Sequence, residues 1–326
     1  MKLTGFIRIL GLIAVAALLA APMGAQAAYP DRPITVVIPF GAGGSHDLHA
    51  RGVTSIMTDI VGQPVIVKLL PGGAGMKATG FVAKARPDGY TILFTHNGID
   101  QLVPQTRKVP FNTLKDFKTV ARINFSTNIW ISPPNKSWKT AKEFIAYAKK
   151  HPGKLNFAHS GVWGSGYTSY MMLAKATGIK TTLIPHKGGG PALRALLAGR
   201  VDASFSQTVQ TRPHLKAGKL LVLAIMGNER LTKDPDFKDV PSMKDLGHPG
   251  VGFQMERIFV VPSKISPDRL NYLRDAFVKL TKNKSYKRFM RSIGMPAQFM
   301  GGGEYDKLRP KKYAVFTDLI KSVTGK

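Results

Sequence analysis

The residues that could do chemistry gather first in a glycine-rich loop. It reads Pro39-Phe-Gly-Ala-Gly-Gly-Ser-His-Asp47, follows an apolar run typical of a strand and opens a helix. Glycines let the backbone turn tightly, so free N–H groups at the helix start can face an anion. Ser45 or Asp47 could instead cap the helix, and capping can coexist with anion binding. The loop therefore predicts an anion site, a capped turn, or both.

Three further loops have a similar setting at the end of a predicted strand. In open α/β sheets, ligands bind at the carboxyl ends of the strands. Each loop alone says little, but four such loops can converge across a cleft. The three loops are Thr95-His-Asn-Gly98, His159-Ser-Gly-Val-Trp-Gly-Ser-Gly166 and Pro185-His-Lys-Gly-Gly-Gly-Pro191.

The familiar catalytic and cofactor motifs do not fit this chain. Ser165 lacks the first glycine of a nucleophile elbow, and no P-loop or H-E-x-x-H motif is present. His46 and His49 lie one helical turn apart and could share a metal, but no third ligand is evident. Gly73–Ala78 matches a dinucleotide fingerprint without its downstream acid. We expect no catalysis, no cofactor and no resident metal, with an exported serine hydrolase using Ser165 as the alternative.

Composition limits the partners. The 326 residues include no cysteine and carry a formal net charge of +28. Absent cysteine excludes disulfides, thiolate nucleophiles and iron–sulfur clusters. The positive charge favours anionic partners, but no RNA- or DNA-reading motif is present, so no nucleic-acid partner is expected.

The first 27 residues predict a cleavable signal peptide. Lys2 and Arg8 precede an apolar run over residues 9–21, and Ala25-Gln-Ala27 offers small residues for cleavage after Ala27. An uncleaved anchor is the alternative, but the run is shorter than the roughly 20 residues that a membrane span needs. We therefore expect an exported protein.

Short β-rich runs alternate with helical stretches through the rest of the chain. This pattern predicts a mostly parallel α/β fold, and nine strands suggest two lobes rather than one sheet. Crossovers near Phe125–Asn128 and Gly252–Arg257 would join the lobes and leave a cleft between them. The predicted division is a signal peptide at 1–27, lobe one at 28–126 plus 256–326, and lobe two at 127–255. The nine predicted strands are 34–38, 65–67, 90–94, 120–123, 128–131, 155–157, 182–184, 202–205 and 220–224.

Several motifs together resemble the TctC/Bug-type solute receptors, the extracytoplasmic binding proteins of tripartite tricarboxylate transporters. The similarity begins in Ala28–Asp47, with Arg51 shortly after, and covers nearly all of the chain after residue 27. It continues in Gly62-Gln-Pro-Val65, Pro71-Gly-Gly-Ala-Gly75, Ala85-Arg-Pro-Asp-Gly-Tyr-Thr-Ile-Leu93, His186-Lys-Gly-Gly-Gly-Pro-Ala-Leu193, Leu197-Ala-Gly-Arg-Val-Asp202 and Lys216-Ala-Gly-Lys-Leu220.

The resemblance implies a two-lobed periplasmic-binding-protein architecture with a hinge and an interlobe cleft that closes on a small carboxylate. Backbone N–H groups, hydroxyls and ordered water would hold the carboxylate oxygens. Carried onto this chain, the implied ligand-binding residues are Phe40, Gly41, Ala42, Gly43, Gly44, Ser45, Asp47, Ser160, Gly161, Gly164, Ser165, Gly166, Lys187, Gly188, Gly189 and Asp202. The strand-end loops add His96 and Asn97, while Trp163 and His186 could line a pocket for a flat acid.

The resemblance also implies partners and a compartment. We expect a periplasmic monomer that binds a small organic acid and delivers it to membrane permease subunits. A receptor that signals to a membrane sensor is an alternative. The chain departs from the family at His186, where Tyr is usual, and at Glu256-Arg257, where Trp is common.

Overall fold

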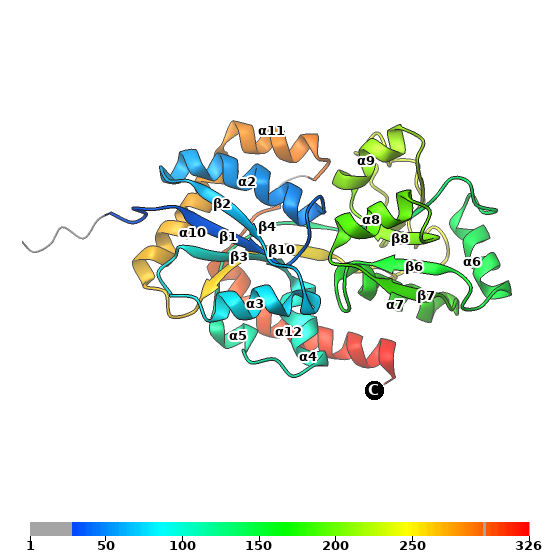
Figure 1. The fold of residues 1–326 in the computed structure, drawn as a ribbon, viewed down its shortest axis with the longest axis horizontal. Coiled ribbons are helices and arrows are strands. Elements are labelled where there is room, and N and C mark those ends of the chain that lie inside the picture. Colours follow the sequence, from blue (N-terminus) through cyan, green and yellow to red (C-terminus); the bar gives the residue numbers. More distant parts are fainter. Residues whose placement is uncertain (1–27, 296–297, 326) are drawn as a thin grey trace, which may run out of the picture. The chain divides into compact units, whose positions relative to one another are not determined.

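The computed structural model describes residues 28–295 and 298–325. The predicted signal peptide at 1–27 therefore lies outside the described residues. From Arg32 onward the chain forms one compact unit that contains two β-sheets with helices on both faces (Figure 1). No helix in the described part is both long enough and apolar enough to cross a membrane.

The first sheet has six strands in the order β11-β4-β10-β3-β1-β2. β1 is parallel to both β2 and β3, whereas β10 is antiparallel to β3 and β4. The strands are β1 (Ile34–Ile38), β2 (Val65–Leu69), β3 (Thr91–His96), β4 (Phe117–Ser126), β10 (Met255–Pro262) and β11 (Met300–Gly301).

The second sheet has five strands in the order β7-β6-β8-β5-β9. β6 is parallel to β7 and β8, and β5 is antiparallel to β8 and β9. The strands are β5 (Asn128–Ser132), β6 (Asn156–His159), β7 (Thr182–Pro185), β8 (Ala203–Ser206) and β9 (Leu221–Met226).

Helices connect these strands. In the first-sheet region they are α2 (Ser45–Val61), η1 (Gly73–Gly75), α3 (Met76–Ala83), the π-helix η2 (Gly98–Leu102), α4 (Val103–Thr106), α5 (Thr113–Asp116), α10 (Pro267–Lys282), α11 (Lys284–Ser292) and α12 (Gly302–Thr324). In the second-sheet region they are α6 (Ala141–Lys150), α7 (Ser165–Thr177), α8 (Gly189–Leu197) and α9 (Thr208–Lys216).

Alternating side chains along the strands build a core on each face of the second sheet. Trp130 on β5 packs against Phe144 of α6 in an edge-to-face contact, with ring centroids 4.8 Å apart. Its neighbours Ile129 and Ile131 point to the other face, where they join the buried side chains of α8. Period-two alternation places successive residues on opposite faces, so this buried strand is apolar throughout.

All nine strands predicted from the sequence are present, with ends shifted by three residues or fewer. The expectation of mostly parallel sheets holds for strand direction, since β1–β4 run one way in the first sheet and β6–β9 run one way in the second. It misses β5 and β10, which run antiparallel to both of their neighbours. The chain passes from one sheet to the other at Thr127 and returns through residues 227–254, so it enters each sheet against the direction of the parallel strands. The exact lobe boundaries stay a prediction.

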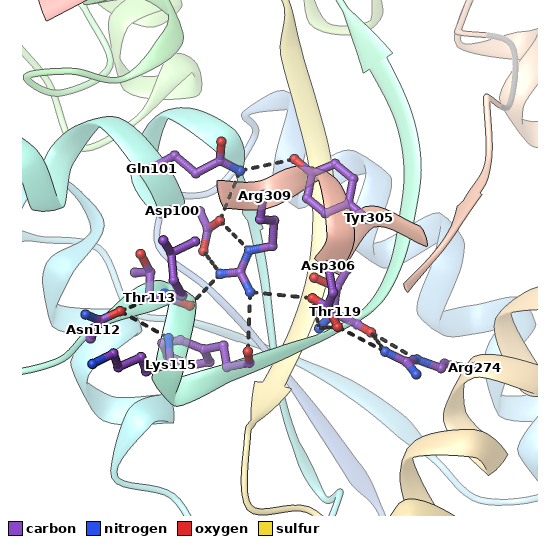
Figure 2. Close-up of polar contacts among 12 residues, drawn as sticks. Asp100, Gln101, Asn112, Thr113, Lys115, Thr119, Arg274, Tyr305, Asp306 and Arg309 are labelled. Atoms are coloured by element: carbon purple, nitrogen blue, oxygen red, sulfur yellow. Dashed lines mark hydrogen bonds and ion pairs between the residues drawn. The ribbon is translucent and has the colours of Figure 1, made fainter. Parts of the chain in front are cut away.

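A buried ion pair fastens α12 to the segment that follows β3 (Figure 2). Arg309 and Asp100 are each 2% exposed, and the guanidinium donates to both carboxylate oxygens over 2.7 and 3.1 Å. Arg309 also donates to the Thr113 and Phe117 carbonyls. Because Asp100 belongs to η2, this contact fixes the backbone directly after His96, at the carboxyl end of β3.

We expect Arg309→Met to lower the free energy of unfolding by about 3–5 kcal/mol, because it leaves the buried Asp100 carboxylate without its partner. Urea unfolding followed by circular dichroism would measure the loss. Arg230→Met is the control, since Arg230 and Asp245 form an exposed pair on the surface. Equal effects of the two changes would contradict the importance of the buried pair.

Candidate functional site

Four helix N-termini meet around one small cavity of about 30 Å³. The N-terminus of α2 contributes Gly44, Ser45 and His46, and that of α7 contributes Ser165 and Gly166. Gly189 begins α8, and Gln207 immediately precedes α9. The remaining lining residues are Phe40, His96, Asn128, Ser160, Phe205, Ser206, Gln210 and Met255.

These helix starts keep their backbone N–H groups available. None of the four N-cap residues caps its helix with a side-chain hydrogen bond; they are Gly44 before α2, Gly164 before α7, Gly188 before α8 and Gln207 before α9. The first N–H groups of a helix have no partner within it, and the helix dipole places partial positive charge there. No carboxylate is among the lining residues that the structure describes. The cavity is therefore suited to an anion.

Glycines bring the loops from the two sheets into direct contact. The Gly41 N–H donates to the Lys187 carbonyl over 2.7 Å. A Cβ on Gly190 would overlap the Ala42 carbonyl oxygen and lie 2.7 Å from the Gly44 nitrogen. Such approaches are closer than any side chain allows, so the loop contact requires glycine at position 190.

Three histidines beside the cavity are buried in neutral form. Burial, and secondarily the charge of Arg257, lowers the pKa of His96 to about 3. The same two causes hold the pKa values of His46 and His49 well below 6.5. The His46 and His96 rings lie 5.4 Å apart, and His96 stacks on Phe40 with a centroid separation of 5.6 Å.

Arg257 lies on β10 beneath these histidines and is fully buried. Its guanidinium donates to the hydroxyls of Ser45 and Ser126 over 2.9 Å each, and to the Asn124 side-chain oxygen over 3.3 Å. Burial lowers the pKa of Arg257 to about 9, which leaves it charged at neutral pH. The sequence interpretation noted Arg257 only as a departure from the family and did not place it near the ligand.

Polar side chains connect this arginine to the second sheet. The Ser126 hydroxyl donates to Gln207 over 2.7 Å, and Gln207 donates to Asn128 over 2.5 Å. Asn128 in turn donates to the Ser165 carbonyl and the Ser169 hydroxyl. The network fixes both amide side chains at the cavity wall.

The predicted site residues fall into three groups. Those that line the cavity are Phe40, Gly44, Ser45, His96, Ser160, Ser165, Gly166 and Gly189. A second group shapes the loops beside it and comprises Gly41, Ala42, Gly43, Gly161, Gly164, Lys187 and Gly188.

The third group is engaged elsewhere. Asp47 accepts from the Gly43 N–H and pairs with Arg51, so its carboxylate stabilises the loop. The Asn97 side-chain oxygen accepts hydrogen bonds from the N–H groups of Gly98 and Glu256. Asp202 precedes β8, at the strand end opposite Ser206, and pairs with Lys136. Trp163 packs in an apolar cluster, and His186 is absent from the cavity lining.

Several lining residues were missed by sequence reasoning. Ser206 and Gln207 follow the predicted strand at 202–205, so their position at a strand end was an available signal. Asn128 and Met255 lie at the two crossovers, where no motif marks them. His46 was considered only as a metal ligand. No group of three potential metal ligands occurs among the described residues.

The hydrolase alternative finds no support in the contacts of Ser165. Its hydroxyl donates to the Asn128 side-chain oxygen over 3.4 Å rather than to a histidine. A serine nucleophile needs a base within hydrogen-bond reach.

Two larger hollows are also present, and the N-terminus of α9 reaches one of them through Thr208. One, of about 520 Å³, is lined by the crossover segments and includes Glu229. The other, of about 810 Å³, is lined by charges of both signs, among them Arg212, Asp234 and Asp236. These hollows are larger than the small cavity. Among the three, only the small cavity is lined by the uncapped N-termini of four helices and by no acidic residue of those that the structure describes. We therefore take the small cavity as the candidate site.

Comparison with known proteins identifies the family of this chain. The family described as "Tripartite tricarboxylate transporter family receptor" matches residues 49–324. The chain belongs to this receptor family. A UPF0065 protein in the gbd 5′ region of Cupriavidus necator is 33% identical over 297 residues, covering 90% of this chain and 88% of that protein. BugT of Bordetella pertussis is 32% identical, covering 76% of each chain. The resemblance seen in the sequence is thereby confirmed.

Solved structures of similar proteins share the fold. The periplasmic binding protein BugD superposes with a TM-score of 0.85 at 26% identity, covering 90% of this chain and 98% of BugD. MatC of Rhodopseudomonas palustris, solved with bound malate, gives 0.82 at 27% identity, covering 90% of this chain and all of MatC (100%). The expected periplasmic-binding-protein architecture is confirmed. Family and fold indicate a binding protein rather than an enzyme.

We expect acid to destabilise the receptor through its buried histidines. Folding lowers the pKa values of these histidines from 6.5 in the unfolded chain, to about 3 for His96. Their full contribution to the free energy of unfolding is therefore present above pH 6.5. It is lost as the pH falls from 6.5 toward the pKa of the folded state. Each histidine then contributes a slope of up to about 1.4 kcal/mol per pH unit. Urea unfolding at a series of pH values below neutrality would measure that slope.

His49→Gln should reduce the slope by about one histidine's share, on the order of 1.4 kcal/mol per pH unit. The control is His151→Gln, which makes the same substitution at an exposed histidine. A slope insensitive to His49→Gln would contradict the burial of a neutral ring at this position.

Proposed function

We propose that this receptor captures a small organic acid by its carboxylate at the cavity where α2, α7, α8 and α9 begin. The observation that carries the proposal is the gathering of four uncapped helix N-termini around a cavity without an acidic lining residue. Backbone N–H groups and the hydroxyls of Ser45, Ser160 and Ser165 would donate to the carboxylate oxygens. Charge-assisted hydrogen bonds of this kind are the strong ones.

MatC, whose fold is similar and whose structure contains malate, supports this ligand class. A cavity of about 30 Å³ holds little more than water. Entry of an acid therefore requires the loop around Gly41 to separate from the loop around Gly190. Binding would then draw the two loops together around the ligand.

Uptake is the proposed role of this binding. The receptor would act in the periplasm as a monomer, after cleavage of the signal peptide behind Ala27, and would deliver its ligand to the membrane permease subunits of a tripartite transporter. Residues 28–126 with 256–326, and residues 127–255, would move as the two lobes. Membership of the receptor family supports this role.

Thermal unfolding against a panel of acids would test the function. Malate, succinate, citrate and benzoate would each be compared with the corresponding amide, using protein purified from the periplasm. An acid at 100 times its dissociation constant should stabilise the receptor by about 2.7 kcal/mol, which raises the midpoint by several degrees. The uncharged amides should not. Ester turnover that disappears in Ser165→Ala, with no acid giving a shift, would favour the hydrolase instead.

Gly190→Ala should weaken acid binding at least tenfold, or about 1.4 kcal/mol. Its Cβ would hold the two loops apart, while alanine is favourable within the helix itself. Gly80→Ala in α3 is the matched control, because its Cβ would meet only the Phe111 ring at an ordinary 3.6 Å. Calorimetric titration with the acid that gives a shift would measure both. Equal affinities would show that loop contact is not required.

A further inference from the structure

Arg257 is a buried cation that lacks an anionic partner. It is fully buried, and no ion pair joins it to any carboxylate in the part of the chain that the structure describes. Its three acceptors are Ser45, Ser126 and Asn124, all of them neutral, and its Nε has no partner there. Arg309, the other deeply buried arginine, has Asp100 as its counter-charge. Buried charges are normally paired, so the exception at Arg257 needs an explanation.

The titratable groups around Arg257 do not supply that counter-charge. His46, His49 and His96 face it, and its positive charge is among the causes that lower their pKa values. These rings are neutral at physiological pH, and they could add only positive charge. The local charge is therefore positive and uncompensated before any ligand is bound.

Hydrogen bonds connect this charge to the cavity wall. Arg257 donates to the Ser45 oxygen, so the Ser45 hydroxyl hydrogen is free to donate to a ligand. On the other side, Arg257 donates to Ser126, whose hydroxyl donates to Gln207. Ser45 and Gln207 both line the cavity, and they come from the regions of different sheets. The unpartnered Nε2 of the buried His46 lies at the same wall.

We propose that Arg257 is the fixed positive charge of the anion site, and that the carboxylate of the bound acid supplies its missing counter-charge through the Ser45 hydroxyl. This inference rests on the proposed function and adds to it that the site selects by ligand charge. Arg257 is a positioning residue, since it lies behind the cavity wall. Electrostatic attraction is strong in a poorly solvated interior, so an acid should bind far better than its amide.

Three variants test the inference, with malate and its uncharged diamide as probes. Arg257→Met removes the charge and keeps an apolar side chain of similar length, while Arg257→Lys keeps the charge. Arg309→Met is the control for loss of a buried, paired arginine. The measurements are the dissociation constant by calorimetry and the unfolding midpoint with and without probe.

We expect Arg257→Met to bind malate at least tenfold more weakly while its ligand-free midpoint stays unchanged or rises. The midpoint should not fall, because the substitution removes a charge that has no counter-charge before ligand binds. Arg257→Lys should retain part of the malate affinity. The diamide should bind weakly and equally to the wild type and to Arg257→Met.

Two results would overturn the inference while the proposed function stands. One is malate binding in Arg257→Met within twofold of wild type. The other is loss of binding with a ligand-free midpoint lowered as far as in Arg309→Met, which would identify a structural cross-link.

Failure of malate to stabilise the wild type would count against the proposed ligand. The ligand-free unfolding midpoints would then test whether Arg257 is a charge without a counter-charge. An unchanged or raised midpoint in Arg257→Met supports a charge awaiting its partner, and a midpoint lowered as in Arg309→Met refutes it.

Discussion

Uncompensated positive potential around one cavity is the constraint on which the rest of the site depends. Backbone N–H groups at a helix start must meet water, a cap or an anion. Here four helices begin at the same place without side-chain caps, and Arg257 adds a full charge behind them. The nearby histidines remain neutral chiefly because they are buried, and the charge of Arg257 lowers their pKa values further.

Acidic side chains near the site form ion pairs and hydrogen bonds within the protein and do not enter the cavity. Asp47 belongs to the first turn of α2, yet its carboxylate bonds the Gly43 N–H and Arg51 instead of entering the cavity. Asp100 neutralises Arg309 and thereby holds η2 behind His96. Glu256, next to Arg257 in sequence, pairs with Arg122 and Lys312. Strand alternation sends neighbouring residues to opposite faces of β10, so Glu256 cannot neutralise Arg257.

Glycines expose the backbone N–H donors of the site and allow the loops from the two sheets to approach closely. Chain segments from the two sheets meet at Gly41 and Gly190 with no side chain between them, which leaves the amides at the start of α2 and α8 close to one another. The same contact makes the cavity small, so ligand entry and loop separation are linked. In the proposed binding mode no reactive side chain is needed, because backbone dipoles and one fixed charge would hold the ligand.

The sequence by itself determined the nine strands, the four strand-end loops and the family, because apolar runs and glycine spacing are local properties. It could not show that Asp202 pairs with Lys136, that the Asn97 side chain bonds the backbone, or that Trp163 packs in an apolar cluster. Only the tertiary structure decided that β10 runs antiparallel and carries Arg257 beneath Ser45, 212 residues away. Electrostatic environment depends on such distant contacts, so the charge behind the cavity has no local signature.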